Sequence, residues 1–441
     1  MDFNLADLFE SVADRVPDAP AVVSGQRRLS FADLEVRSNR LAHHLAGAGI
    51  GPGDFVGLHL VNGPEYLEGM LACFKLRAVP VNVNWRYVEA ELRHLYDDAG
   101  LVGLLYHRQF SDAVDAALPA MTEARAVLAV DDGTDTTGSG DGYEAALAAS
   151  SPERSFGPRT GDDLYCVYTG GTTGMPKGVL WRHEDIFFAA MGGGDPMQFG
   201  NVITTPDELP DRVLEPGHAA LPVPPLIHAS AQWLAFHTLF GGGKLVLLPG
   251  GRFDPATTWR LVAEVSVNIL VIVGDAMARP LLDVVEHAGD EIDTSSLMAL
   301  GSGGAILSPS TKERLHERFP DLVVVDAFGA SETGQLGGSP PEDDPFGAPQ
   351  LTVDDRTAVF DDDLQPVQPG SGGVGRLARG GRVPLRYHGD ASKLSDDSQL
   401  ECGVCWWVYD PAVGDEVDQV AAGTPFALLP DTWRCPNCDA E

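Results

Sequence analysis

Short apolar runs alternate with amphipathic helical stretches over most of this 441-residue chain. The runs are rich in Val, Leu and Ile and are bounded by Gly, Asp or Pro; examples are "DFVGLHLV", "GLVGLLYH", "AVLAVDD", "GKLVLLPG", "VNILVIVG" and "DLVVVDAFG". Helical patterns such as "FADLEVRSNRLAHHLAGAG" and "PSTKERLHERF" lie between several of them. Strands that alternate with helices form mostly parallel sheets covered by helices. The sequence therefore predicts an α/β fold of mostly parallel sheets flanked by helices.

The composition changes near residue 390. The stretch "DASKLSDDSQL" (390–400) is polar and acidic, and residues 398–441 then hold four of the six cysteines and three of the seven tryptophans. A segment this small buries little apolar surface and needs a covalent or metal staple. We predict a large domain over residues 1–392, a linker over 393–399 and a small metal-stapled β domain over 400–441.

The formal net charge of −34 excludes several classes of partner. Such an excess of acid disfavours binding to nucleic acid and to anionic membranes. No apolar run reaches the length of a membrane span. The N-terminal "MDFNLADLFESVADRV" has helical apolar spacing and lacks the basic start and continuous apolar stretch of a signal peptide. We therefore expect an amphipathic surface helix there and a cytoplasmic protein. The isolated Cys73 and Cys166 are expected to be buried apolar residues.

A Gly/Thr-rich loop follows a strand pattern in "LYCVYTGGTTGMPKGVLWRHED" (164–185). Backbone N–H groups and the hydroxyls of Thr169, Thr172 and Thr173 can bind phosphate oxygens, and Lys177 adds a positive charge. The spacing is not that of a Walker A motif. Taken alone, such a loop is more often a flexible turn than a phosphate site.

The segment YTGGTTGMPKG resembles the phosphate-loop signature of the adenylate-forming superfamily, in the version found in bacterial acyl-CoA synthetases. Three further segments resemble that family in the same order: "PLIHASAQW" (225–233) the element lining the acyl pocket, "GSGGAILS" (301–308) the turn beside adenine, and "DAFGASETG" (326–334) the motif ending in a metal-binding glutamate. The resemblance extends over residues 1 to about 392. It implies the large N-terminal domain of an adenylate-forming enzyme, in which a carboxylate attacks the α-phosphorus of ATP.

The resemblance also assigns roles to individual residues. Lys177 and Glu332 are the candidate catalytic residues, and Glu332 is expected to hold Mg²⁺ beside Mg-ATP. His228 either shapes the acyl pocket or is a packed core histidine. Residues expected to bind the ATP phosphates or adenine are Thr169, Gly170, Gly171, Thr172, Thr173, Gly174, Lys177, Gly303, Gly304, Phe328 and Ser331, the last standing where the family usually has Thr.

The chain departs from the family after "GRLARGGRVPLRYHGD" (375–390). A ribose-binding aspartate, a hinge and a small domain with a catalytic lysine would follow in the family, whereas here the polar linker follows. Arg386 also replaces a glycine. We expect weak or absent ligase turnover, and thiolation by CoA is the most doubtful step.

Two CxxC pairs, Cys402/Cys405 and Cys435/Cys438, lie in the last 44 residues. In a chain without export signals such pairs more often bind metal than form disulfides. Four thiolates suit either zinc or a single iron, and spacing alone leaves both open. The pattern "CxxCxxxYDPxxGD" followed by "GTPFALLPDTWRCPNC" resembles rubredoxin along its whole length. The resemblance implies one iron held by these four cysteines, an aromatic core, and one-electron transfer to a reductase or hydrogenase-related partner protein.

Two residues depart from the rubredoxin pattern. Trp406 and Asp439 stand where glycine usually follows each CxxC. Trp tolerates a positive φ poorly and Asp moderately. The sequence therefore leaves open the backbone geometry after each CxxC pair and the reduction potential of the metal site.

Three hypotheses follow. The first is a rubredoxin electron carrier tethered to an impaired acyl-adenylating domain. The second is an acyl-CoA synthetase-like ligase, acting on a carboxylic acid, ATP and CoA, in which the four cysteines form a structural zinc or iron clip. The third is a fused or frame-disrupted gene product with an inert N-terminal scaffold.

Overall fold

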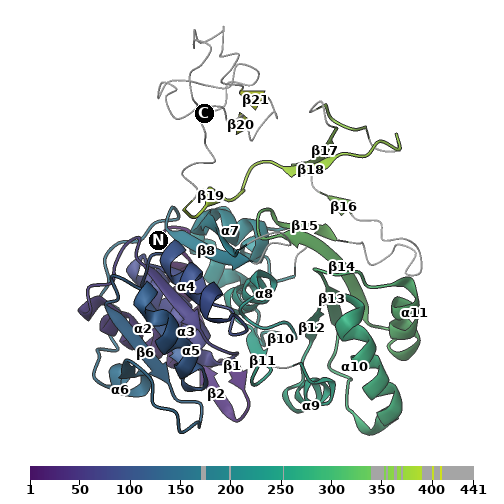
Figure 1. Ribbon diagram of the computed structural model, residues 1–441. Coiled ribbons are helices and arrows are strands. Elements are labelled where there is room, and N and C mark those ends of the chain that lie inside the picture. Colours follow the sequence, from purple (N-terminus) through teal and green to yellow (C-terminus); the bar gives the residue numbers. More distant parts are fainter. Residues whose placement is uncertain are drawn as a thin grey trace.

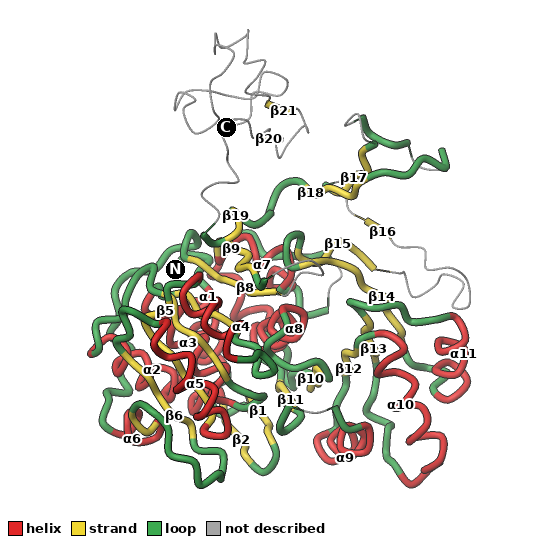
Figure 2. The backbone as a smooth tube through the Cα atoms, viewed as in Figure 1, coloured by secondary structure: helices red, strands yellow, loops and turns green. Residues whose placement is uncertain are grey.

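A computed structural model describes residues 1–169, 175–197, 200–251, 253–338, 352–353, 356–361, 365–368, 371–389, 400–401 and 408–409 (Figure 1). Parallel sheets flanked by helices form the bulk of this part of the chain, so the predicted α/β fold is confirmed. Figure 2 shows helices packed between and outside the strands of the large unit. The four predicted cysteine ligands and the linker lie outside the described residues.

Helices α1, α2 and α11 lie within the three stretches for which the sequence predicts a helix, and eight further α-helices are present in the described residues. The α-helices are α1 (Leu5–Arg15), α2 (Phe31–Gly47), α3 (Pro64–Leu76), α4 (Glu89–Asp98), α5 (Ser111–Ala117), α6 (Tyr143–Ala148), α7 (His183–Ala190), α8 (Ala229–Phe240), α9 (Pro255–Val265), α10 (Gly274–Ala288) and α11 (Pro309–Arg318). Local caps define several starts. Ser30 and Asp33 form a capping box at α2, and Asn4 accepts hydrogen bonds from the first turn of α1.

A five-stranded parallel sheet forms the N-terminal α/β unit, in the order β4-β3-β5-β6-β7. Its strands are β3 (Phe55–His59), β4 (Val79–Asn82), β5 (Leu101–His107), β6 (Ala126–Val130) and β7 (Asp141–Gly142). All seven residues of β5 are buried, as expected for a strand covered on both faces.

A nine-stranded sheet follows, in the order β16-β15-β14-β13-β12-β10-β11-β1-β2. Its strands are β1 (Pro20–Ser24), β2 (Arg27–Ser30), β10 (Ala219–Pro222), β11 (Lys244–Leu247), β12 (Ile269–Ile272), β13 (Ala299–Ser302), β14 (Val323–Ala330), β15 (Gly334–Gly338) and β16 (Thr352–Val353). The strands from β1 to β14 in this order pair in parallel, whereas β2, β15 and β16 add antiparallel edges. Polar groups placed after β10, β12, β13 and β14 therefore share one edge of the sheet.

A third sheet is antiparallel and has the order β19-β9-β8. It pairs β19, from the C-terminal part of the large unit, with one of the two strands that flank the Gly/Thr-rich loop. Its strands are β8 (Leu164–Thr169), β9 (Lys177–Arg182) and β19 (Arg386–Tyr387). Two small antiparallel pairs complete the described strands: β17 (Thr357–Phe360) with β18 (Arg376–Arg379), and β20 (Leu400–Glu401) with β21 (Val408–Tyr409).

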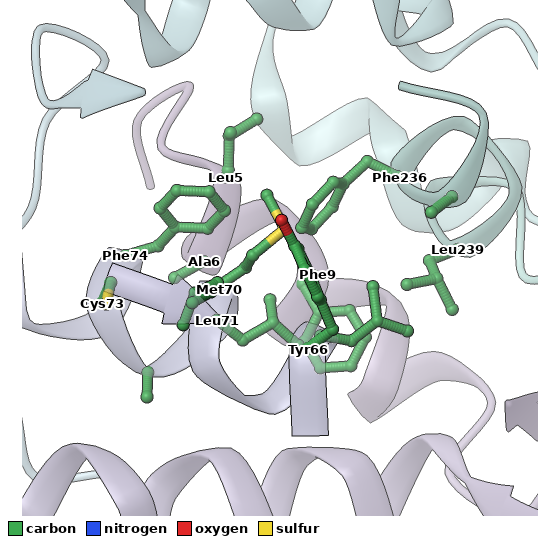
Figure 3. Close-up of a cluster of buried hydrophobic side chains, with 14 of the residues drawn as sticks. Leu5, Ala6, Phe9, Tyr66, Met70, Leu71, Cys73, Phe74, Phe236 and Leu239 are labelled. Carbon is green, nitrogen blue, oxygen red and sulfur yellow. The ribbon is translucent and has the colours of Figure 1, made fainter. Parts of the chain in front are cut away.

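The largest apolar core lies where α1, α2, α3 and α8 meet (Figure 3). Phe9, Tyr66 and Phe236 are fully buried in it, so α1 is more deeply enclosed than the expected surface helix. Cys73 and Cys166 are buried free thiols, as predicted. Within the described residues, no helix is both long and apolar enough to cross a membrane.

Candidate functional site

The β8–β9 hairpin holds the two ends of the Gly/Thr loop. Thr169 ends β8 and Lys177 begins β9, and the two residues stand directly opposite each other in the ladder. Lys177 is exposed and Thr169 is half-buried. Gly170, Gly171, Thr172, Thr173 and Gly174 lie outside the described residues. The hairpin thus places a hydroxyl and an ammonium group together at the mouth of the predicted phosphate loop.

Gly303 and Gly304 come directly after β13, at the edge where the parallel strands end. A Cβ atom on Gly303 would lie 3.1 Å from the carbonyl oxygen of Ala327 in β14, so the two backbones approach closely. Gly304 has φ of +79°, which L residues with side chains rarely adopt. The backbone of this turn therefore favours glycine at 304 through its positive φ, and a side chain at 303 would crowd β14.

Phe328 lies on β14, the strand beside β13, and is half-buried. Ser302 of β13 pairs with Asp326 of β14, which brings Phe328 to the same edge as Gly303. A register shift between Phe328 and Gly329 in the β14–β15 pair bends the strand there. The structure thus brings the three predicted adenine contacts together at one edge of the sheet.

Ser331 and Glu332 occupy the turn between β14 and β15. The indole N–H of Trp181, in β9, donates a hydrogen bond of 2.9 Å to the backbone oxygen of Ser331. The hydroxyl of Tyr387, in β19, donates one of 3.0 Å to Oε1 of Glu332. Two donors from the antiparallel sheet therefore hold the turn that carries the candidate magnesium ligand.

Tyr387 also lies against Lys177. The Lys177 ammonium is 5.7 Å from the centre of the Tyr387 ring. Tyr387 pairs with Val179, and Lys177 is two residues before Val179 on the same strand, so both side chains lie on one face of the sheet. Sequence reasoning did not assign Tyr387 a role. The one indication in the sequence is that Tyr387 directly follows Arg386 in "PLRYHGD".

Arg386 fits its position without strain. Arg386 lies in β19 and pairs with Leu180 of β9. Its φ is not positive, since the described non-glycine residues with positive φ are Arg77 and Ser266. The change from the family's glycine therefore leaves the strand intact. It adds an exposed cation on the strand that carries Tyr387.

His228 borders a cavity of about 190 Å³ at the ends of β10 and β11. It occupies the position before the first residue of α8 without a side-chain capping hydrogen bond and is exposed, so the structure does not place it in the core. Partial loss of hydration around the imidazole, with a further contribution from the Arg86 charge, lowers the pKa of His228. Other residues lining the cavity are Asn84, Val223, Phe253 and Met277.

Glu332 supplies a hard carboxylate oxygen, which is the donor type that Mg²⁺ prefers. The residue is half-buried and accepts a hydrogen bond from Tyr387, whose ring also lies near the Lys177 ammonium. Glu332 would thus be a suitable ligand for a magnesium ion bound together with ATP. Within the described residues, no group of three or more His, Cys, Asp or Glu side chains is arranged to hold a metal by protein ligands alone.

Comparison with known proteins agrees with this architecture. The sequence model described as "AMP-binding enzyme" matches residues 9–382, and that described as "Rubredoxin" matches residues 399–441. The chain therefore belongs to the AMP-binding enzyme family and carries a C-terminal rubredoxin domain. Both family resemblances seen in the sequence are confirmed.

Curated relatives are acyl-CoA ligases. The chain is 44% identical over 403 residues to a 3-oxocholest-4-en-26-oate–CoA ligase of Rhodococcus rhodochrous, covering 89% of this chain and 72% of the relative. It is 37% identical over 458 residues to the medium-chain acyl-CoA ligase Mig of Mycobacterium avium, covering 100% of this chain and 82% of that protein.

Solved structures share the fold. The anthranilate CoA ligase AuaEII, solved with anthranoyl-AMP, superposes with a TM-score of 0.76 at 18% identity, covering 92% of this chain and 77% of that one. The N-terminal domain of FACL13 from Mycobacterium tuberculosis gives a TM-score of 0.72 at 23% identity, covering 88% and 91% of the two chains.

Proposed function

We propose that this protein is an acid–CoA ligase-type enzyme that forms an acyl-adenylate from an apolar carboxylic acid and Mg-ATP. The proposal is carried by a chain of contacts at the antiparallel sheet. Thr169 pairs with Lys177, and Tyr387 contacts both Lys177 and Glu332. The ligase names of the relatives support this activity more directly than electron transfer, which the sequence had placed first.

The chemistry uses charge neutralisation and positioning. A carboxylate oxygen of the acid forms a bond to the α-phosphorus, the bond to the bridging oxygen breaks, and pyrophosphate leaves with the electron pair. Lys177 would offset the negative charge of the phosphates, and Glu332 would hold Mg²⁺. Bound Mg²⁺ supplies further neutralisation of the phosphate oxygens. Preorganised charges of this kind contribute most when they need little rearrangement during the reaction.

For the acid, we propose a fatty acid or the side-chain carboxylate of a 3-oxo steroid, because relatives are named for both classes. The cavity beside His228 is about 190 Å³, smaller than the typical range of small-molecule pockets, roughly 300–1,000 Å³. It therefore accommodates part of such a substrate in this conformation. CoA is proposed as the acyl acceptor, and the expectation of weak turnover stays a prediction.

ATP–pyrophosphate exchange tests the ligase proposal. Full-length protein is assayed with medium-chain and long-chain fatty acids and with 3-oxocholest-4-en-26-oate. Lys177→Ala is expected to lower exchange by about 100-fold or more, the effect typical of removing one charge-stabilising group. Arg260→Ala, which removes an exposed cation on α9, serves as the matched control and is expected to match wild type. If wild-type protein shows no more exchange than Lys177→Ala with any of these acids, the proposal is contradicted.

A second function is proposed for the rubredoxin domain, because its match spans residues 399–441 and includes all four cysteines. We propose that Cys402, Cys405, Cys435 and Cys438 hold one iron and exchange single electrons with a reductase-type or hydrogenase-related partner. We retain the division into 1–392, 393–399 and 400–441 as part of this proposal. Stoichiometric iron with visible absorption that bleaches with dithionite supports it, whereas a colourless zinc protein contradicts it.

A further inference from the structure

Tyr387 connects the two charged residues of the proposed Mg-ATP site. Its hydroxyl donates to Glu332 at 3.0 Å, and its ring lies 5.7 Å from the Lys177 ammonium. The three residues come from separate parts of the chain: β9, the turn after β14, and β19. One side chain therefore contacts both the candidate metal ligand and the candidate phosphate ligand.

The backbone around Tyr387 is held firmly enough to act as a support. The N–H of Leu385 donates to Leu180 at 2.8 Å, and that of His388 donates to Gly178 at 2.6 Å. The His388 ring lies 4.3 Å from the Phe55 ring. Upstream, Arg382 pairs with Glu184 at 2.9 Å. The segment is thus anchored on both sides of Tyr387.

The two contacts of Tyr387 act on different groups. A hydrogen bond to a carboxylate is directional and selects one orientation of the Glu332 side chain. The face of the tyrosine ring attracts the Lys177 ammonium electrostatically and so limits where that group lies. Removing the hydroxyl alone therefore separates the effect on the metal ligand from the effect on the lysine.

We propose that Tyr387 is a positioning residue of the Mg-ATP site, which orients Glu332 through its hydroxyl and Lys177 through its ring. The proposal rests on the proposed function, since it assumes that these two residues bind Mg-ATP. It predicts two separable effects. Loss of the hydroxyl weakens the Mg²⁺ dependence of nucleotide binding, and loss of the ring weakens nucleotide binding further.

Calorimetric titration of full-length protein with ATP, at a series of Mg²⁺ concentrations and without any acid, tests the proposal. Tyr387→Phe is expected to raise the Kd for Mg-ATP about 5-fold, and Tyr387→Leu about 20-fold, within the usual range for charge-assisted and cation–π contacts. Tyr143→Phe removes a tyrosine hydroxyl that donates to Glu68 at 2.5 Å, away from the site, and is the matched control with an unchanged Kd.

A double-mutant cycle separates positioning from a general structural role. In a Glu332→Ala background, which removes the acceptor of the Tyr387 hydroxyl, Tyr387→Phe is expected to change the Kd for Mg-ATP by less than about 2-fold, because coupled residues are non-additive. In exchange assays, Tyr387→Phe should raise the KM for Mg-ATP and leave that for the acid unchanged. An equal effect of Tyr387→Phe in both backgrounds, or an unchanged Kd in the wild-type background, overturns the proposal.

The binding and exchange readouts distinguish this proposal from the ligase function. Tyr387-dependent Mg-ATP binding without exchange on any acid supports the positioning role and contradicts the ligase proposal. Exchange that is indifferent to Tyr387→Phe supports the ligase and overturns the positioning role. Wild-type protein that fails to bind Mg-ATP overturns both.

Discussion

His183 shows how a single buried side chain joins distant segments. Its Nε2 lies 3.1 Å from the Leu164 carbonyl, and because a carbonyl only accepts, Nε2 carries the proton. Nδ1 then accepts from the Asn4 side chain at 3.0 Å and from the Leu5 N–H at 3.3 Å. The neutral ring therefore ties the start of α1 to the β8–β9 hairpin.

Burial lowers the pKa of His183 to about 3. An unfolded histidine titrates near 6.5, so between these values only the unfolded chain binds the proton. Stability is thus fully present above about pH 6.5 and falls toward pH 3, by at most about 1.4 kcal/mol per pH unit for this residue. His183→Gln should flatten the decline in urea-unfolding free energy between pH 7.5 and 5.

Burial likewise lowers the pKa of His59 to about 3, so part of the decline persists in His183→Gln. His287→Gln, at an exposed position on α10, is the matched control and should keep the wild-type slope. A slope in His183→Gln equal to that of wild type contradicts the assignment of a buried neutral histidine.

At the scale of elements, a buried ionic cluster holds the first three helices together. The Lys75 ammonium of α3 lies 2.5 Å from Glu10 of α1 and 2.8 Å from Glu35 of α2. Arg154 and Arg159 reach the same carboxylates from the segment between α6 and β8. Burial alone would raise the pKa of Glu10, but Arg159 and Lys75 bring it below its usual value. These helices are therefore locked by charge as well as by apolar packing.

Lys75→Ala is expected to lower the free energy of unfolding by about 3–5 kcal/mol, because it leaves buried carboxylates without a cation. Urea denaturation followed by circular dichroism measures the change. Arg260→Ala breaks a half-exposed ion pair with Glu264 and should cost less than about 1 kcal/mol. A loss below 1 kcal/mol in Lys75→Ala would mean that Arg154 and Arg159 already compensate both carboxylates.

At the scale of the whole molecule, the chain combines two families of different chemistry. The AMP-binding match ends at residue 382 and the rubredoxin match begins at residue 399. Tyr387, which contacts both candidate ATP-site residues, falls in the short stretch between the two matches. The stretch that leads toward the rubredoxin domain thus contains a residue that contacts the proposed nucleotide site.

A paired substitution tests how far the two proposed activities depend on each other. Cys402→Ser with Cys435→Ser should remove the visible iron absorption, since each CxxC pair loses one thiolate ligand. We expect ATP–pyrophosphate exchange to stay within about 2-fold of wild type, because neither cysteine is among the residues proposed to bind Mg-ATP and independent sites usually act additively. Exchange that falls together with iron content would show that the rubredoxin domain supports the nucleotide site.

Local patterns predicted much of the fold because they act over a few residues. The run around Val56 and the spacing from Phe31 to Gly47 specify a strand and a helix through side-chain period alone. Gly304 is a similar case, since its positive φ is a property of one turn. His228 was left open between pocket and core, because exposure depends on neighbours that spacing does not reveal.

By itself the sequence determined both family memberships, the α/β class, the Gly/Thr loop and the four cysteine ligands to be tested. These features are carried by residue types at short, regular spacing. Only the tertiary structure decided that Tyr387 joins Lys177 to Glu332, and that Lys75 is buried between two carboxylates. Such contacts link segments far apart in the chain, so they depend on strand register and helix packing rather than on any local pattern.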